Sequence, residues 1–317
     1  MRRNWLMTWI FLFNFFLFVD LSIAEDEVRL GYLNVVPSLP TFVALEKGYF
    51  QELGLRVNAT SFESGTLIVD ALMAGRVDVN AMSSMIGYWL LEQRIPGTFK
   101  IFLVYGAKES RDDTFVVMAA KDSSLNGIMD LKGKRIGVFP GITSLALAKA
   151  ALRRSFDPDK DATFIEIPPG NIVQALASGH IDAYFTPEPF GMIGVAKGVA
   201  RYLVKSPMSS LNLKTGIIGG AFVFNSKFLT EKPLVAKKVK GAIYKGVDFI
   251  QTNEMEARKY LVKYANLPEP FAMKIPLENW IKIEQFNKAS GQPYFDVLKN
   301  EGLFQKDIDT SQLYCQE

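Results

Sequence analysis

Four short segments are rich in serine and threonine, and each stands where a predicted strand turns into a helix. A hydroxyl at such a place can cap the helix. It can equally bind a ligand, because the free N–H groups and partial positive charge of a helix N-terminus attract anions and hydrogen-bond acceptors. We expect Ser84, Thr143 and Ser144 to contact a ligand first of all, followed by Ser38 and Thr66. The segments are 37–41, 64–66, 83–84 and 141–144, and they add Thr41, Ser83 and Gly141 to the candidates.

Glu188 is an acidic candidate of another kind. It stands between Pro187 and Pro189 and directly before Phe190. Its carboxylate could accept a hydrogen bond from an amine or a ring N–H of a ligand. It could also fix the proline turn or bind a donor in a hinge, and the sequence leaves both readings open. Among the aromatic residues, Tyr32 and Phe190 are candidates for a flat apolar wall of the site.

The chain has few residues of the types that most often act in catalysis. His180 is the single histidine and Cys315 the single cysteine, which removes most Ser-His-Asp, Cys-His and histidine-rich zinc arrangements. Five residues separate Gly127 from Gly133, so the phosphate-binding run G-x-x-x-x-G-K is absent and nucleotide hydrolysis must come from another chain. We therefore expect a binding protein rather than an enzyme, with no catalytic residue, no metal and no cofactor.

A ten-residue repeat indicates which elements position the candidates. Residues 69–78, VDALMAGRVD, return as residues 173–182, VQALASGHID. In each copy an apolar helix runs into a glycine that can adopt the left-handed conformation, and an apolar strand follows. The spacing of 104 residues is too long for a solenoid and indicates two similar lobes with a cleft between them. Asp78 and Asp182 end the two copies, and we expect them to stabilise the turns.

Each half of the chain also opens with a strand, a small-residue turn, a helix and a second strand. This alternation predicts parallel sheets with helices on both faces, in which ligands bind beyond the carboxyl ends of the strands. The predicted strands are 28–33, 55–59, 135–139 and 164–167, and the predicted helices end at Gly54 in the first half and run from 143 to 154 in the second.

Two segments, 101–119 and 214–225, have the pattern of crossovers between the lobes. Beyond Pro233 the chain becomes polar and helical, and these helices would cover the first lobe. They are predicted near 233–252, 254–265 and 276–289. We therefore divide the chain into an N-terminal segment 1–24, a discontinuous lobe 1 (27–110 and 217–317) and a continuous lobe 2 (111–216).

Four stretches, in order along the chain, resemble solute-binding proteins of ABC importers that serve nitrate, taurine, alkanesulfonates and thiamine-pyrimidine precursors. They are LEKGYFQELGL at 45–55, ALMAGRVD at 71–78, DLKGKRIGV at 130–138 and EPF at 188–190. The resemblance implies the α/β, two-lobe type II periplasmic binding-protein fold, with a hinge and an interlobe ligand cleft. It also implies a monomer that delivers a small molecule to an ABC permease with a separate ATPase subunit.

Two other functions use the same fold and stay open. One is an enzyme, such as a lyase like those of the menaquinone pathway, and the other is a sensory module that presents its ligand to a receptor kinase. The cysteine-rich, iron-binding motif of the related thiamine-pyrimidine synthases is missing from this chain, so the resemblance does not predict synthase activity.

The first 24 residues have the layout of a secretory signal peptide. Arg2 and Arg3 precede the apolar run from Trp5 to Val19, and small residues end at Ala24. We expect cleavage and a periplasmic location, with a retained membrane anchor as the alternative. The residue directly after Ala24 is not a cysteine, which argues against a lipid anchor. The net charge of +3 gives no reason to expect a nucleic-acid partner.

The sequence does not choose the ligand. Uncharged hydroxyl segments suit a small anion such as nitrate or bicarbonate, and taurine, longer sulfonates and aromatic acids are open as well. Glu188 and the aromatic residues suit a larger molecule that is partly cationic or carries a ring, such as a pyrimidine.

Overall fold

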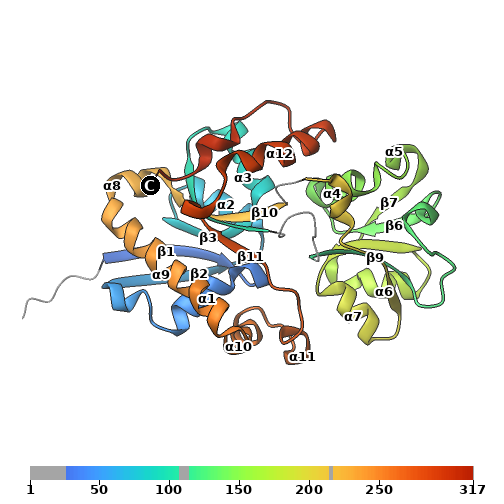
Figure 1. The fold of residues 1–317 in the computed structure, drawn as a ribbon, viewed down its shortest axis with the longest axis horizontal. Coiled ribbons are helices and arrows are strands. Elements are labelled where there is room, and N and C mark those ends of the chain that lie inside the picture. The colour runs from blue at the N-terminus through green and yellow to red at the C-terminus, as the bar shows by residue number, and fades with distance from the viewer. Residues whose placement is uncertain (1–25, 107–113, 214–216, 317) are drawn as a thin grey trace, which may run out of the picture.

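The structure is a computed structural model that describes residues 26–106, 114–213 and 217–316 (Figure 1). Two sheets, each covered by helices, form two lobes that lie side by side. We call the part around the larger sheet lobe 1 and the part around the smaller sheet lobe 2. The expected signal peptide, residues 1–24, lies outside the described residues. In those described, no helix is long and apolar enough to cross a membrane.

The sheet of lobe 1 has six strands in the order β11-β4-β10-β3-β1-β2. Strand β1 pairs in parallel with β2 and β3, whereas β10 and β11 pair antiparallel to their neighbours. The strands are β1 (Asp26–Leu33), β2 (Leu55–Phe62), β3 (Val79–Ser84), β4 (Phe99–Gly106), β10 (Ile218–Asn225) and β11 (Asn279–Lys282).

The sheet of lobe 2 has five strands in the order β7-β6-β8-β5-β9. Strand β6 pairs in parallel with β7 and β8, and β5 pairs antiparallel with β8 and β9. The strands are β5 (Phe115–Ala120), β6 (Arg135–Val138), β7 (Thr163–Glu166), β8 (Ala183–Pro187) and β9 (Ala200–Lys205).

The prediction of parallel sheets was right for only part of each sheet, because both sheets are mixed. Strands β1, β2 and β3, like β6, β7 and β8, follow the strand–helix–strand pattern and are parallel. The antiparallel partners β5 and β10 come from the two predicted crossover segments, which enter each sheet from the other lobe. Of these segments, residues 107–113 and 214–216 lie outside the described residues. A chain that crosses between lobes reaches the sheet from the opposite end. The periodicity within one segment does not predict the direction in which that strand will run in the sheet.

Helices cover both faces of each sheet (Figure 1). In lobe 1 they are α1 (Leu39–Glu46), α2 (Gly65–Met73), α3 (Met85–Arg94), α8 (Ser226–Glu231), α9 (Pro233–Thr252), α10 (Glu254–Tyr264), α11 (Glu269–Ala272) and α12 (Gly291–Asn300). In lobe 2 they are α4 (Ile142–Leu152), α5 (Pro158–Asp161), α6 (Ile172–Ala177) and α7 (Phe190–Ala196).

Two predicted helices differ from the structure. The first helix ends at Glu46 rather than near Gly54, because Gly48 adopts a left-handed φ of 71° and a separate short turn follows. The helix predicted at 276–289 is absent, and this segment contains β11, which pairs with β4 through Trp280 and Tyr105. Trp280 is buried and its Nε1 donates to the carbonyl oxygen of Pro37 at 2.9 Å. Sheet pairing and burial override the helical pattern here.

One buried cluster of hydrophobic side chains spans both lobes. It joins Trp89 of α3 and Phe295 of α12 to Val117 of β5 and Leu147 of α4. A second cluster packs α1 and α9 against the other face of the lobe 1 sheet. There the backbone of α9 lies so close to α1 that a Cβ on Gly246 would stand 2.3 Å from the carbonyl oxygen of Pro40. Buried side chains of the two lobes thus pack against each other beside the space between them.

The repeat forms the same turn in each lobe. Gly75 and Gly179 have left-handed φ values of 63° and 70°, as predicted. Asp78 accepts hydrogen bonds from the backbone N and Nε of Arg29, at 2.8 and 3.1 Å. Asp182 accepts the same pair of bonds from Arg135 at the same distances. Each aspartate thus ties the turn to a parallel strand of its lobe, β1 in lobe 1 and β6 in lobe 2, which is the structural role expected for it.

The aspartate of lobe 2 gives a pH-dependent prediction. Its hydrogen bond to Arg135 lowers the pKa of Asp182 below the unfolded value of about 3.9. A carboxylate with a lowered pKa stabilises the fold above the unfolded pKa, and this contribution is lost as pH falls through the folded pKa. We expect Asp182→Asn to lower the free energy of unfolding by about 1–2 kcal/mol at pH 7, because charge-assisted bonds are weakened.

Urea denaturation at pH 7 and at pH 3 measures this effect. The difference between Asp182→Asn and the unchanged protein should shrink at the lower pH. Asp122→Asn is the control, because Asp122 is exposed in the same lobe. Equal losses for the two variants at pH 7 would show that the arginine–aspartate pair does not stabilise the turn.

Candidate ligand-binding cleft

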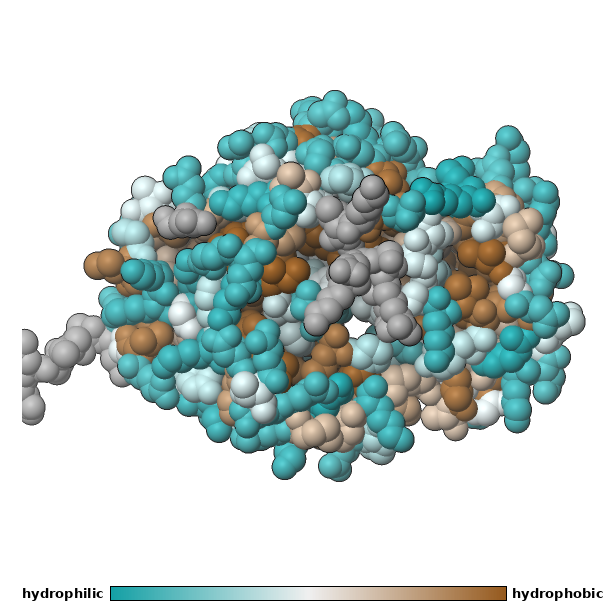
Figure 2. Space-filling model, in the orientation of Figure 1, coloured by the Kyte–Doolittle hydropathy of each residue, from teal (hydrophilic) through white to brown (hydrophobic). Residues whose placement is uncertain are grey.

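A cleft of about 560 Å³ lies between the two lobes, and both contribute to its walls. Figure 2 shows the surface hollowed at this place, with hydrophobic side chains beside the hollow. The polar and aromatic side chains of lobe 1 at the cleft are Asn34, Ser84, Tyr105, Glu278 and Tyr294. Those of lobe 2 are Thr114, Phe115, Phe139, Thr143, Ser144, Glu188 and Phe190.

Lobe 1 presents the N-terminus of α3 to the cleft. Strand β3 runs to Ser84, which is the N-cap of α3 but makes no side-chain capping bond. Ser84 and Ile86 both line the cleft. The first N–H groups of a helix have no partner within the helix. This end of α3 can therefore hold an acceptor group of a ligand, and the Ser84 hydroxyl can donate or accept.

Lobe 2 presents the N-terminus of α4 in the same way. The helix follows Gly141, whose φ of 114° is a conformation that glycine adopts readily. Thr143 and Ser144, in the first turn of α4, line the cleft. Gly141 itself is not among the lining residues, and its N–H donates to Oε1 of Glu166 at 3.1 Å. Two helix N-termini, one from each lobe, thus border the same space.

Glu188 borders the cleft at the end of β8, and its carboxylate is held within lobe 2. Oε1 accepts from the hydroxyl of Tyr202 at 2.6 Å, and Oε2 accepts from the backbone N of Met192 at 3.0 Å. Burial and the hydrogen bond to Glu188 raise the pKa of Tyr202. Both donors are uncharged, so the site keeps the negative charge of the carboxylate. The carboxylate thus fixes the start of α7, and the residue itself lines the cleft.

Aromatic rings form much of the wall on the side of lobe 2. Phe139 and Phe190 meet edge to face, with ring centroids 4.9 Å apart and planes at 83°. Phe190 was predicted as a wall residue, whereas sequence reasoning missed Phe139. It directly precedes Pro140 and Gly141 before α4, so its place at the carboxyl end of β6 was a usable signal.

Glu278 and Tyr105 were also missed. Glu278 directly precedes β11, and β11 pairs with β4 so that Asn279 stands opposite Gly106 and Trp280 opposite Tyr105. This pairing brings Glu278 beside Tyr105 at the edge of the cleft. Burial raises the pKa of Tyr105, and the negative charge of Glu278 adds to the shift. Because 276–289 was predicted to be a helix, no local pattern placed Glu278 at a strand end.

Six of the predicted site residues lie outside the lining of the cleft. Tyr32 packs edge to face on Phe42 and Tyr264. Thr66 is exposed on α2, and Gly141 is exposed before α4. The remaining three, which are Ser38, Thr41 and Ser83, are buried. The predicted residues that the structure brings to the cleft are Ser84, Thr143, Ser144, Glu188 and Phe190.

The side chains at the cleft can hold a solute by hydrogen bonds, charge and apolar contact. Within the described residues, no group of His, Cys, Asp and Glu is arranged to hold a metal ion. His180 is exposed on the turn between α6 and β8, and Cys315 is buried near the C-terminus. The arrangement suits a small-molecule site shared by two lobes.

A model of the NMT1-like family matches residues 23–266 of the chain. Among curated relatives, a protein of Brucella abortus (strain 2308), named as a binding protein without a stated ligand, is 27% identical over 247 residues. That match covers 77% of this chain and 74% of the relative.

Solved structures show the same fold. The periplasmic aliphatic sulphonate binding protein SsuA from Escherichia coli has a TM-score of 0.73 and 18% identity, covering 91% of this chain and 97% of its own. The periplasmic nitrate-binding protein NrtA from Synechocystis PCC 6803 has a TM-score of 0.66 and 17% identity, covering 90% and 84%. The desulfurization enzyme DSZB reaches 0.66 with 14% identity, covering 92% and 97%. These likenesses confirm the two-lobe periplasmic binding-protein fold.

Proposed function

The chain belongs to the NMT1-like family, and we propose that it is an exported solute-binding receptor of an ABC importer. The observation that carries this proposal is the cleft, because both lobes line it and each turns a helix N-terminus toward it. A solute in this space would contact the two lobes at once. The names of the sulphonate-binding and nitrate-binding proteins on the same fold support a transport role.

Closure of the lobes is the mechanism that this geometry supports. An open cleft offers the solute the contacts of one lobe, and a closed cleft adds those of the other. The solute therefore binds the closed form more tightly and shifts the equilibrium toward it. The two crossover segments would act as the hinge, since the described chain leaves lobe 1 after β4 and returns to it at β10. The closed form would then dock on a membrane permease that a separate ATPase drives.

Export is the second part of the proposal. The N-terminal segment 1–24 would direct secretion and be cleaved, which places the receptor in the periplasm as a monomer. Detecting the mature protein in the periplasmic fraction, with Glu25 as its first residue, would support this step. Finding the intact chain in the cytoplasm would favour an enzyme on the same fold, of which the desulfurization enzyme is an example.

The test of solute binding combines a ligand panel with solution scattering. Each of the small anions, sulfonates, aromatic acids, amines and pyrimidines is added to the purified protein, and the thermal unfolding midpoint is recorded. A solute at 100 times its dissociation constant stabilises the native state by about 2.7 kcal/mol. We expect the solute that raises the midpoint to lower the radius of gyration as well. Tight binding without compaction would contradict the closure mechanism.

Ser144→Ala tests whether the first turn of α4 contacts the solute. Loss of one hydrogen bond should weaken binding about two- to tenfold in a titration with the solute found above. Ser178→Ala is the matched control, because Ser178 is an exposed residue at the end of α6, outside the cleft lining. An equal dissociation constant for the Ser144 variant and the unchanged protein would remove α4 from the proposed site.

A further inference from the structure

We propose that Met82 of lobe 1 selects the solute, and that the solute carries a flat aromatic ring, which lies between Met82 and the phenylalanines of lobe 2. This inference rests on the proposed solute-binding function and deepens it, because it names a specificity-determining residue and the chemical class of the ligand. Two independent observations carry it. One is the backbone of Met82, and the other is the aromatic wall that lobe 2 contributes to the same cleft.

The backbone of Met82 has a conformation that residues other than glycine rarely adopt. Its φ is 116°, and a bulky L residue is strained at such an angle. The other non-glycine residues with positive φ in the described chain are Ser206, Asn212 and Asn266, whose φ values of 50–53° lie in the ordinary left-handed region. A glycine would hold the position of Met82 without this strain. Strained backbone is concentrated at functional sites, so the methionine side chain is a candidate for a functional role.

A bulge in β3 accompanies this conformation. Asn80 pairs with Val223 of β10 and Ser83 pairs with Ala221, so three steps along β3 stand opposite two steps along β10. The additional residue lies between Asn80 and Ser83, where Met82 has its unusual φ. A bulge bends the strand and changes the direction in which the neighbouring side chains point.

The bulge decides which side chain of β3 reaches the cleft. Asn80 pairs with Gly31, and a Cβ on Gly31 would stand 3.0 Å from a side chain of α2, so both residues face that helix. Regular alternation would turn Met82 toward the same helix. Instead, Met82 packs in the hydrophobic cluster on the opposite face of the sheet. The hydroxyl of Ser83 lies at the start of α2, 3.1 Å from where a Cβ on Gly65 would stand. Met82 therefore lines the cleft, whereas Ser83 is buried.

Lobe 2 contributes three phenylalanine rings to the same cleft. Phe115, Phe139 and Phe190 all line it, and all three are only partly buried. Phe139 and Phe190 meet edge to face with ring centroids 4.9 Å apart, and Phe115 stacks on Phe185 at 5.3 Å. The exposed surface of these rings favours contact with an apolar ligand. A ligand ring can in addition stack on them or meet them edge to face.

Methionine suits the side of a ring that faces lobe 1. Its thioether is flexible and polarizable, and its sulfur makes favourable contacts with aromatic rings. The cleft has a volume of about 560 Å³, which lies in the range of sites for small organic molecules. A four-atom anion such as nitrate would leave most of these apolar walls uncovered. A ring between Met82 and the phenylalanines would cover the walls of both lobes.

Calorimetric titration tests the ligand class with pairs of probes that share a charged group and differ in the ring. The pairs are benzoate and acetate, benzenesulfonate and methanesulfonate, and benzylamine and methylamine. We expect one ring-bearing probe to bind at least about tenfold more tightly than its partner, because burial of a phenyl ring is favourable. Smaller ratios in all three pairs would overturn the proposal, and so would failure of every ring-bearing probe to bind at millimolar concentration.

A further probe tests the flat ring itself. The cyclohexane analogue of the tightest ring-bearing probe has a similar size, but its ring is saturated and puckered. We expect it to bind several-fold more weakly, because it cannot stack on the phenylalanines or meet them edge to face. Equal binding of the two would show that the site selects apolar bulk and would overturn the aromatic class.

Met82→Ala tests whether Met82 selects the ligand. The substitution enlarges the cleft on the side of lobe 1, so the naphthalene analogue of the tightest probe should gain several-fold in affinity relative to that probe. Met118→Ala is the matched control, because Met118 is a buried methionine of strand β5 outside the cleft lining. Loosened packing alone would not change the ratio of the two affinities. An unchanged ratio in Met82→Ala would remove Met82 from the site.

Met82→Gly tests the strain without any ligand. At an ordinary strand position, glycine lowers the urea midpoint below that of alanine. At Met82 we expect the reverse order, because glycine adopts a φ of 116° without strain and alanine does not. The glycine variant also serves for the binding test if Met82→Ala fails to fold. A lower midpoint for Met82→Gly than for Met82→Ala would show that the bulge is not strained and would contradict the role assigned to Met82.

Scattering with the same probes separates this inference from the proposed function. If acetate, methanesulfonate or methylamine binds as tightly as its ring-bearing partner and compacts the protein, the receptor function stands and the ligand class is wrong. If a ring-bearing probe binds tightly without compaction, the ligand class stands and closure is wrong. Each result therefore decides between the two statements.

Discussion

Replacing Trp89 by alanine is expected to lower the free energy of unfolding by about 3–5 kcal/mol, the range for truncating a large buried aromatic side chain. Trp89 lies on α3 and is fully buried. Its indole meets the rings of Tyr294, Phe295 and Phe304 nearly edge to face, with centroids 5.5–5.9 Å apart. Removing the indole leaves a cavity at the centre of this aromatic group, and α12 loses the side chain that it packs on.

The same substitution should affect the cleft. Tyr294 lies on α12 and lines the cleft, so a loosened α12 no longer fixes this part of the wall. Trp89→Phe should lower the free energy of unfolding by less than the difference in size between the two side chains suggests. The indole Nε1 is buried without a hydrogen-bond partner within the described residues, and phenylalanine has no polar atom to leave unsatisfied.

Urea denaturation of the two variants measures this prediction. Leu234→Ala is the control, because its side chain is 75% exposed on α9, and a surface substitution should change stability by no more than about 0.5 kcal/mol. A loss for Trp89→Ala as small as that of the control would show that the aromatic group does not hold α3 and α12 together.

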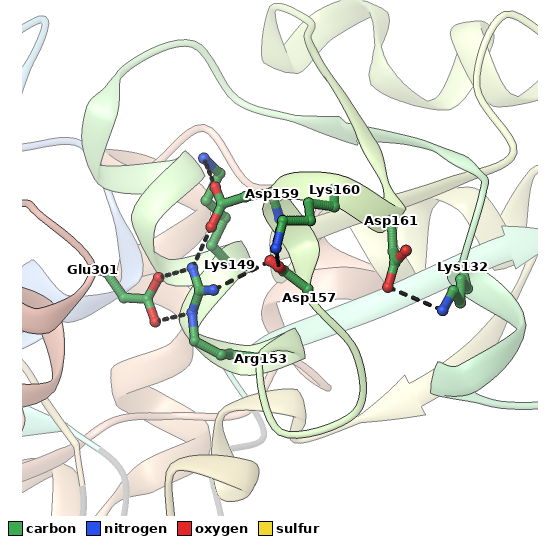
Figure 3. A network of polar contacts seen from close by, with 8 residues as sticks. All are labelled: Lys132, Lys149, Arg153, Asp157, Asp159, Lys160, Asp161 and Glu301. Atoms are coloured by element: carbon green, nitrogen blue, oxygen red, sulfur yellow. Dashed lines mark hydrogen bonds and ion pairs between the residues drawn. The ribbon is translucent and has the colours of Figure 1, made fainter.

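The second large effect is expected at Arg153, which joins the lobes. Its Nε and Nη2 donate to the two carboxylate oxygens of Glu301, both at 2.6 Å, and Nη2 also donates to Asp159 at 2.7 Å. Arg153 ends α4 in lobe 2, and Glu301 ends α12 in lobe 1. Figure 3 shows the guanidinium between Glu301 and the carboxylates of Asp157 and Asp159.

Arg153→Met should therefore lower the free energy of unfolding by about 2–3 kcal/mol. The side chain of Glu301 is only 6% exposed, and a buried carboxylate that loses its partner is strongly destabilising. The expected loss of free energy is smaller than that for a fully buried ion pair, because the side chain of Arg153 is 41% exposed and water screens its charge. The hydrogen bonds to Glu301 and Asp159 raise the pKa of Arg153, so it stays charged over the working pH range.

Arg154→Met is the matched control. Arg154 is the next residue along the chain, and its Nη2 donates to the carbonyl oxygen of Leu211 at 3.4 Å. The double variant of Arg153→Met and Glu301→Gln should lose less than the sum of the single variants, since each removes the same interaction. Additive losses, or equal losses for Arg153→Met and Arg154→Met, would show that no interlobe ion pair stabilises the fold.

Local patterns in the sequence predicted much of the scaffold. The repeat ending in Asp78 and Asp182 predicted two equivalent turns, and the structure forms both with the same arginine–aspartate geometry. A left-handed glycine, an apolar run and a capping residue act within about ten residues of chain. Their positions can therefore be predicted without knowledge of the rest of the fold.

The candidate site was predicted only in part. Ser84, Thr143 and Ser144 reach the cleft because they follow strands at the ends of which helices begin. Ser38 and Thr41 have the same local pattern, but α9 and Trp280 pack over the start of α1, and both residues are buried. Local pattern identifies a helix N-terminus, whereas burial by distant elements decides whether it faces a ligand.

By itself, the sequence determined that the chain forms two similar lobes, where their turns lie and which hydroxyl residues precede helices. Only the tertiary structure decided the antiparallel strands, the place of Glu278 at the cleft and the pairing of Arg153 with Glu301, which are 148 residues apart. The physical reason is the range of the interactions. Turn and helix signals act between neighbours in the chain, but strand pairing and interlobe contacts depend on which distant surfaces pack together.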